Sequence, residues 1–152
     1  MQRLVGLLLL ALVPFAAGPA WAQGVEVTGA WARATMPGQK VAAVYMDLRS
    51  DRAAKLVGVE SPIADAAEVH EMRNQDGVMR MRHIEAVDLP AGQVVKLAPG
   101  GFHVMLFDIK APIKPGDKVK LTLKIEQGGK VQDVQVVAAV KPPSAAGGHA
   151  DH

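Results

Sequence analysis

The sequence contains no cysteine, and this absence excludes several kinds of site. Without thiols the chain can form no disulfide, no thiolate nucleophile, no Cys-based zinc site and no blue-copper centre. It also lacks the lipobox cysteine that carries the lipid of a bacterial lipoprotein. Any metal site in this chain must therefore use imidazole, carboxylate or thioether donors.

The sequence also lacks a large excess of positive or negative charge. The chain has 17 Lys and Arg residues against 15 Asp and Glu residues, and the two signs are interleaved along it. A nucleic-acid-binding surface would instead gather basic residues, so we expect no nucleic-acid partner. After the N-terminal segment no amphipathic pattern of helical length and no second long apolar run occurs, so we expect no membrane span in the processed protein.

The N-terminal residues are typical of a secretory signal peptide. Arg3 precedes an apolar run over residues 4–13, and Ala20-Trp21-Ala22 has the small-x-small pattern of a cleavage site. The run is too short to cross a bilayer. We therefore expect export to the periplasm. The expected organisation is a signal peptide over residues 1–22, a single domain over 23–140 and a flexible, His-containing tail over 141–152.

Short runs with period-two alternation, separated by Gly, Pro and Asp turn signals, predict an all-β protein. The alternation is cleanest at residues 118–126, where apolar and Lys or Thr side chains alternate. Many short strands at this spacing favour a Greek-key β-sandwich, as in immunoglobulin-like domains. The predicted strands cover residues 25–33, 41–49, 55–59, 68–72, 78–84, 94–97, 102–109, 118–126 and 131–140.

Histidine and methionine gather in two of these segments. Asp76-Gly77 predicts a tight hairpin, with a loop of either two or four residues. In either register one face of the hairpin carries the following side chains: His70, Met72, Met79, Met81 and His83. In the later strand His103 and Met105 are two residues apart and point the same way. Imidazole and thioether together suit Cu(I) far better than Zn(II), Mg(II) or Ca(II).

The spacing of four of these residues resembles the periplasmic copper chaperones called PCu(A)C, which are implicated in building the CuA centre of cytochrome c oxidase. Their pattern is His, ten residues, Met, twenty-one residues, His-x-Met, and it is matched by His70, Met81, His103 and Met105. The surrounding residues are also similar over 25–126, at Ala32-Arg33-Ala34-Thr35, Val69-His70-Glu71-Met72, Gly77-Val78-Met79, Leu97-Ala98-Pro99-Gly100-Gly101 and Leu121-Thr122-Leu123.

The resemblance implies a cupredoxin-like sandwich that holds Cu(I) with these four residues and performs no catalysis. It implies delivery of the metal to a partner, either cytochrome c oxidase subunit II or another periplasmic copper chaperone. A periplasmic copper storage or tolerance protein and a metal-free structural sandwich are the alternatives. Four further residues are candidates for secondary metal contacts: Met72, His83, His149 and His152. His149 and His152 lie in the tail. They would either bind Cu(II) weakly or belong to a solvated end without a role.

Overall fold

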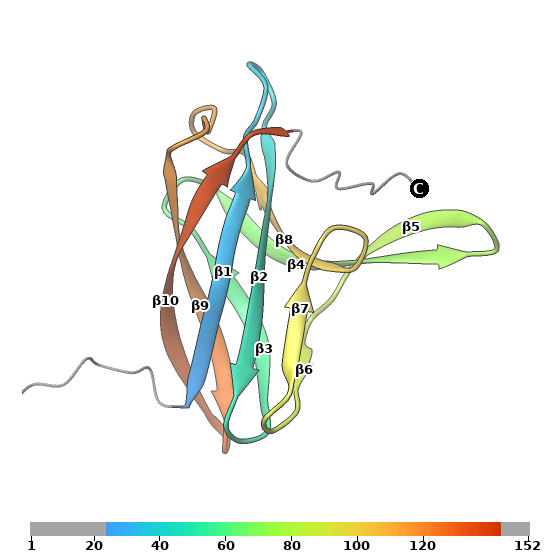
Figure 1. The fold of residues 1–152 in the computed structure, drawn as a ribbon, viewed down its shortest axis with the longest axis vertical. Helices are drawn as coiled ribbons and strands as arrows, with labels where there is room; N and C mark the ends of the chain where they lie inside the picture. Colours follow the sequence, from blue (N-terminus) through green and yellow to red (C-terminus); the bar gives the residue numbers. More distant parts are fainter. Residues whose placement is uncertain (1–23, 144–152) are drawn as a thin grey trace, which may run out of the picture.

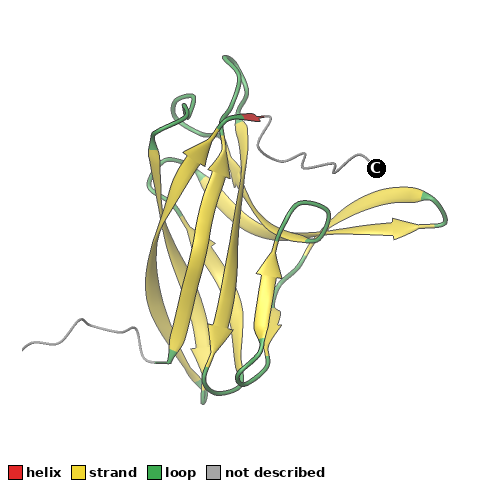
Figure 2. Cartoon of the chain, in the orientation of Figure 1, coloured by secondary structure: helices red, strands yellow, loops and turns green. Residues whose placement is uncertain are grey.

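The computed structural model describes residues 24–143, and this part of the chain consists of ten β-strands joined by turns (Figures 1 and 2). No helix within these residues is long and apolar enough to cross a membrane. The strands are β1 (Val25–Arg33), β2 (Val41–Ser50), β3 (Ala54–Glu60), β4 (Ala66–Gln75), β5 (Val78–His83), β6 (Val87–Leu89), β7 (Val94–Leu97), β8 (Phe102–Phe107), β9 (Lys118–Gln127) and β10 (Lys130–Lys141).

The strands form a continuous ladder in the order β5-β4-β8-β7-β2-β1-β10-β9-β3-β6, with β8 also pairing with β2. Most neighbours are antiparallel, whereas β1 with β10 and β7 with β8 are parallel. Crossover connections of this kind are typical of Greek-key folds. The expected all-β, cupredoxin-like class is therefore confirmed.

One hydrophobic core fills the interior, and every strand except β5 contributes a buried apolar side chain to it. The alternation predicted along β9 is confirmed, because its apolar residues are almost fully buried while the intervening residues are not. The largest fully buried side chains are Met46, Leu48, Leu56, Leu89, Leu97, Leu106, Ile109, Leu121, Leu123, Ile125, Val44 and Val104. Each such side chain stabilises the fold by about 1.5–3 kcal/mol when removed from water.

The β4–β5 hairpin projects from the body of the domain (Figure 1). Asp76 and Gly77 both have positive φ, of 54° and 82°, as a two-residue type I′ turn requires. The pairs Gln75 with Val78 and Met72 with Met81 show that the shorter of the two predicted loops is present. Every residue of β5 is exposed, so hydrogen bonds to β4 hold this strand rather than burial in the core.

Several predicted strand bounds differ from the structure by one to three residues, and one strand was not predicted. Strand β6 was not predicted. It is three residues long, and it is defined by its pairing with Ala54, Lys55 and Leu56 of β3. The strand predicted over 102–109 ends at Phe107, because Asp108 adopts a positive φ of 50° that interrupts the ladder. At the other end of the chain β10 continues to Lys141, whose carbonyl accepts a hydrogen bond from the Ala34 amide.

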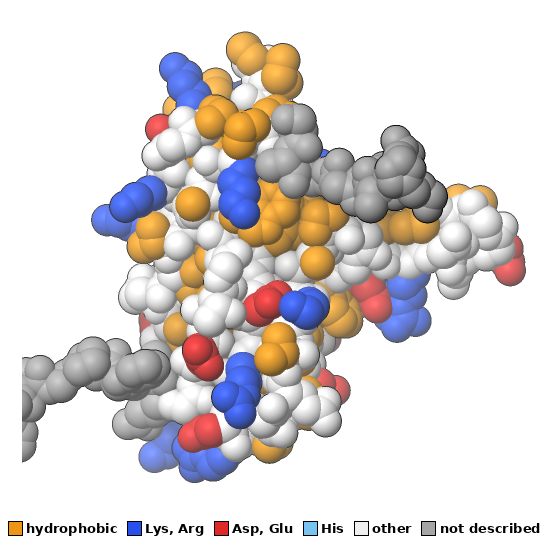
Figure 3. All heavy atoms as spheres, in the orientation of Figure 1, with side chains coloured by type: hydrophobic (Ala, Val, Ile, Leu, Met, Phe, Trp, Pro, Cys, Tyr) orange, Lys and Arg blue, Asp and Glu red, His pale blue; other side chains and the backbone are white. Residues whose placement is uncertain are grey.

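The surface shows the interleaved charges that the sequence indicated. On the face drawn in Figure 3, Lys and Arg side chains alternate with Asp and Glu side chains, and apolar atoms lie between them. Among the charged residues of the domain, Lys96 forms an ion pair with Asp47 at 2.9 Å and Lys124 with Asp133 at 3.0 Å. Hydrogen bonding to Asp133 is the main cause that raises the pKa of Lys124.

Candidate metal centre

Three histidines lie in one row across three neighbouring strands. His70 on β4 pairs directly with His83 on β5 and with His103 on β8. The ring centroids are 5.8 Å apart for His70 and His83, and 6.1 Å apart for His70 and His103. Side chains that are directly opposite in a sheet share one face. His70 is therefore the central imidazole of the row.

The two methionines of the predicted ligand set flank His70 on opposite sides. Met81 pairs with Met72, one row closer to the hairpin tip, whereas Met105 pairs with Glu68, one row away from it. Each methionine is thus a diagonal neighbour of His70. In a flat sheet the Met81 and Met105 Cα atoms would be about 16 Å apart, from four residues along the strands and two strand spacings. Sheet curvature and the long side chains must shorten this separation if both sulfurs are to reach one ion.

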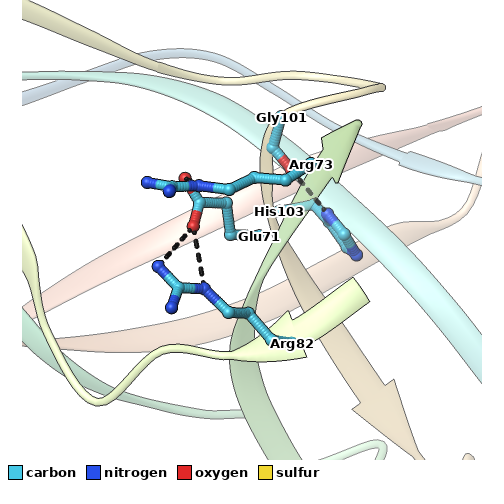
Figure 4. A network of polar contacts seen from close by, with 5 residues as sticks. All are labelled: Glu71, Arg73, Arg82, Gly101 and His103. Carbon is cyan, nitrogen blue, oxygen red and sulfur yellow. Dashed lines mark hydrogen bonds and ion pairs between the residues drawn. The ribbon is translucent and has the colours of Figure 1, made fainter. Parts of the chain in front are cut away.

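His103 is buried, with 4% of its surface exposed, and its orientation is set by the backbone. Its Nδ1 lies 3.1 Å from the Gly101 carbonyl (Figure 4). The same carbonyl accepts a hydrogen bond from the Met72 amide at 3.0 Å. A carbonyl only accepts, so Nδ1 of His103 carries the proton. In the neutral ring Nε2 therefore keeps its lone pair, and metal-binding histidines are commonly oriented by such a bond.

His70 also presents a free nitrogen. Its Nε2 lies 2.8 Å from Oε2 of Glu68, and its Nδ1 is buried without a hydrogen-bond partner among the described residues. An ionised carboxylate only accepts, so Nε2 is the donor and Nδ1 keeps the lone pair. A buried acceptor without a partner is unfavourable in the metal-free protein. A ligand for that nitrogen would remove this cost.

Glu68 bridges two of the histidines. Its carboxylate lies 2.8 Å from Nε2 of His70 and 3.4 Å from Nδ1 of His83. The hydrogen bond from His70 is the main cause that lowers the pKa of Glu68, desolvation opposes it, and the charge of His83 lowers the pKa further. Sequence reasoning missed Glu68 as a candidate. The available signal was its position two residues before His70, which places both side chains on the same face of a strand.

The opposite face of the hairpin carries an acid between two guanidinium groups (Figure 4). Nε of Arg73 lies 2.8 Å from Oε1 of Glu71, and Arg82 donates to Oε2 through Nε at 3.1 Å and Nη2 at 3.0 Å. The bond from Arg73 is the main cause that lowers the pKa of Glu71, desolvation opposes it, and Arg82 lowers it further. This network connects β4 and β5 behind the histidine row and supports the hairpin there.

The structure thus places most of the candidate residues on one face, the outer face of β5, β4 and β8. It brings His83 into the row, and it pairs Met72 with Met81. One donor atom from each of Glu68, His70 and His83 lies within 4.8 Å of the others. His149 and His152, and the expected cleavage site after residue 22, lie outside the described residues.

The fold defines the class of the protein as an all-β, cupredoxin-like domain. The chain belongs to the LpqE-like family, because residues 25–138 match the family described as "Putative lipoprotein LpqE-like". It is 34% identical over 110 residues to "Putative lipoprotein Lxx21020" of Leifsonia xyli, and 34% identical over 98 residues to "Uncharacterized protein RP573" of Rickettsia prowazekii. These matches cover 70% and 60% of this chain, but only 65% and 54% of the two relatives.

Solved PCuAC domains are similar to this chain in both fold and sequence. The copper-bound PCuAC domain from PmoF2 is 31% identical with a TM-score of 0.65, and the match covers 81% of this chain and 97% of that domain. Apo-DR1885 from Deinococcus radiodurans is 31% identical with a TM-score of 0.60, over 93% of this chain and 94% of that one. Its Cu(I) form is 35% identical with a TM-score of 0.60, over 83% and 85%. The relation to PCuAC domains is thereby confirmed.

Proposed function

We propose that this protein is a periplasmic copper chaperone that binds Cu(I) through His70, Met81, His103 and Met105. The observation that carries the proposal is the pair of imidazoles that face each other across β4 and β8. Each ring has one nitrogen that keeps its lone pair, Nδ1 of His70 and Nε2 of His103. A thioether stands diagonally on either side of this pair. The copper-bound PCuAC domain and the Cu(I) form of DR1885 among the similar structures support the choice of metal.

The chemistry of the donors fits the reduced ion. Thioether sulfur is a soft ligand that favours Cu(I), and imidazole binds copper in both oxidation states. Methionine is also a suitable donor outside the cytosol, where thiols are readily converted to disulfides. The sequence has no cysteine, so these thioethers are its soft donors.

The contrast between the two ends of the site fits release of the metal to a partner. His103 is buried and oriented by Gly101, whereas Met81 is 47% exposed on a strand that contributes nothing to the core. Met81 is therefore the ligand that an incoming protein can replace first. The remaining donors would keep the ion bound until the partner's own ligands have attached.

We assign the protein a binding and transfer role rather than a catalytic one. A carrier requires a complete ligand set that can be exchanged, and it needs neither a nucleophile nor a general base. The proposed recipient is the CuA centre of cytochrome c oxidase, on subunit II, or another periplasmic copper chaperone. Storage of copper for tolerance would use the same ligands without a recipient, and transfer to a purified CuA domain separates the two roles.

The proposed location is the periplasm, after removal of residues 1–22 as a signal peptide. The domain would then extend over residues 23–140 and precede the tail at 141–152. The lipoprotein description of the family supports an exported protein. A soft Cu(I) site without thiols is also suited to that oxidising compartment.

Anaerobic Cu(I) titration combined with X-ray absorption tests the proposal. The expected result is one equivalent of Cu(I) with two nitrogen and two sulfur neighbours. Met81→Leu should remove one sulfur neighbour, while Met79→Leu should leave the spectrum unchanged. Met79 is the matched control because it is 52% exposed, lies two residues away on the same face of β5 and stands outside the ligand set. A Cu(I) complex without sulfur neighbours, or no binding at all, would contradict the proposal.

A further inference from the structure

We infer that Glu68, His70 and His83 form a second metal site, which takes Cu(II) and shares His70 with the Cu(I) site. One donor atom of each residue lies within 4.8 Å of the other two. His83 and Glu68 are outside the set of four Cu(I) ligands. Glu68 orients His70 in the function proposed above, but that function gives no role to the approach of His83 to the same carboxylate. The site does not depend on that function being correct.

The distances between the donor atoms are close to those expected around a bound metal ion. The Glu68 carboxylate lies 2.8 Å from Nε2 of His70 and 3.4 Å from Nδ1 of His83. Donors that share one ion at bond lengths of about 2.0–2.2 Å are roughly 3–4 Å apart. Only small side-chain movements would therefore place an ion between the three groups. The half-buried Glu68 and the exposed His83 lie outside the core, so they can make these movements without disturbing it.

The donor set selects the kind of ion. Two imidazoles and one carboxylate offer nitrogen and oxygen without sulfur, and Cu(II) binds such sites more tightly than the other common divalent ions. The carboxylate of Glu68 would compensate part of the ion's charge, and its Oε2 already lies 2.8 Å from Nε2 of His70. The same cluster would disfavour Cu(I) relative to the thioether-containing site.

The cluster is accessible from solvent. A groove of about 280 Å³ lies between β3, β4 and the end of β5, and its lining includes both Glu68 and His83. An ion can enter through this groove, and water molecules can occupy its remaining coordination positions. Val57, Gly58 and Val59 line the β3 side of the groove, and the carboxylate of Glu85 adds a second negative charge to its lining.

His70 connects the two sites through its two nitrogens. Its Nδ1 lacks a partner and suits the Cu(I) set, whereas its Nε2 faces Glu68. Because a neutral imidazole has a single lone pair, His70 serves one ion at a time. Cu(II) at Nε2 requires the ring proton to move to Nδ1. The protein can therefore hold copper of either oxidation state at adjacent positions without moving a strand.

Cu(II) titration of the full chain tests the inference, with EPR to count nitrogen ligands. The parent for this test carries His149→Ala and His152→Ala, so that the tail cannot supply imidazoles. The expected spectrum shows two nitrogen ligands. His83→Gln and Glu68→Gln should each weaken Cu(II) binding by roughly tenfold or more, since loss even of an outer partner has that effect at metal sites. Glu26→Gln, at an exposed acid on β1, is the matched control and should change nothing.

The two proposals fail separately in this design. Cu(I) affinity of His83→Gln should stay within about threefold of the parent, which is less than 1 kcal/mol. Glu68→Gln is left out of this comparison, because Glu68 also accepts the hydrogen bond that leaves Nδ1 of His70 free for Cu(I). If His83→Gln binds Cu(II) as tightly as the parent, or shows the same two-nitrogen spectrum, the second site is wrong. If Cu(I) fails to bind the parent while Cu(II) binds through His83, the chaperone proposal is wrong and the second site stands.

Discussion

Replacement of Met81 by alanine should weaken Cu(I) binding while leaving the fold nearly as stable as before. Met81 is 47% exposed and lies on β5, which has no buried residue. Full burial of a methionine side chain is worth about 1.5–3 kcal/mol, and Met81 realises at most about half of this. We therefore expect Met81→Ala to lower the free energy of unfolding by no more than about 1.5 kcal/mol.

Met46 provides the opposite case within the same protein. Its side chain is 1% exposed in the core, and truncation of such a methionine to alanine costs about 2–5 kcal/mol. Met46→Ala should lower the free energy of unfolding by that amount and leave the Cu(I) affinity of the folded protein unchanged. The two substitutions remove the same atoms, so any difference between their effects comes from the position of the methionine in the structure.

The assay consists of urea unfolding of the metal-free protein and Cu(I) competition against a chromophoric chelator. Metal must be absent from the unfolding measurement, because a ligand that binds only the folded state adds to apparent stability. For Met81→Ala we expect Cu(I) affinity to fall by roughly tenfold or more, equivalent to at least 1.4 kcal/mol. Met79→Ala should change neither quantity. A loss of stability as large as that of Met46→Ala, with unchanged Cu(I) affinity, would refute the reasoning and assign Met81 to packing.

Three further predictions concern other parts of the chain. Glu71→Gln should destabilise the hairpin at neutral pH. Folding lowers the pKa of Glu71, so its carboxylate stabilises the folded state above the unfolded pKa of about 4.3. This stabilisation is lost as the pH falls through the folded pKa. Urea midpoints of the two proteins should thus converge towards pH 3, and a constant difference would contradict this role. N-terminal sequencing of exported protein should begin at Gln23, whereas retention of residues 1–22 in the membrane fraction would indicate an anchor. Truncation after Val140 should leave Cu(I) binding intact and remove a weak Cu(II) equivalent, and unchanged Cu(II) stoichiometry would show that the tail binds none.

The all-β fold class and most strand positions could be predicted from local pattern. Period-two alternation identified nine of the ten strands, because burial on one face of a strand leaves a direct record in the residues. The pattern could not predict β6, because three residues are too few to show a period and the pairing of β6 with β3 is a tertiary contact. The Asp76-Gly77 pair predicted the hairpin but left two loop lengths open. The positive φ of both residues and the pairing of Gln75 with Val78 select the shorter one.

The sequence by itself determined which residue types are available and which side chains share a face. It placed His70 with Met72 on one strand and His103 with Met105 on another, because alternate residues of a strand point the same way. Only the tertiary structure decided that β8 lies on the other side of β4 from β5, so that His70 faces His103 as well as His83 of the hairpin. The same arrangement brought Glu68 to two imidazoles and left Nδ1 of His70 without a partner. Periodicity fixes the direction of a side chain, but which strand stands beside it depends on long-range pairing that no local pattern encodes.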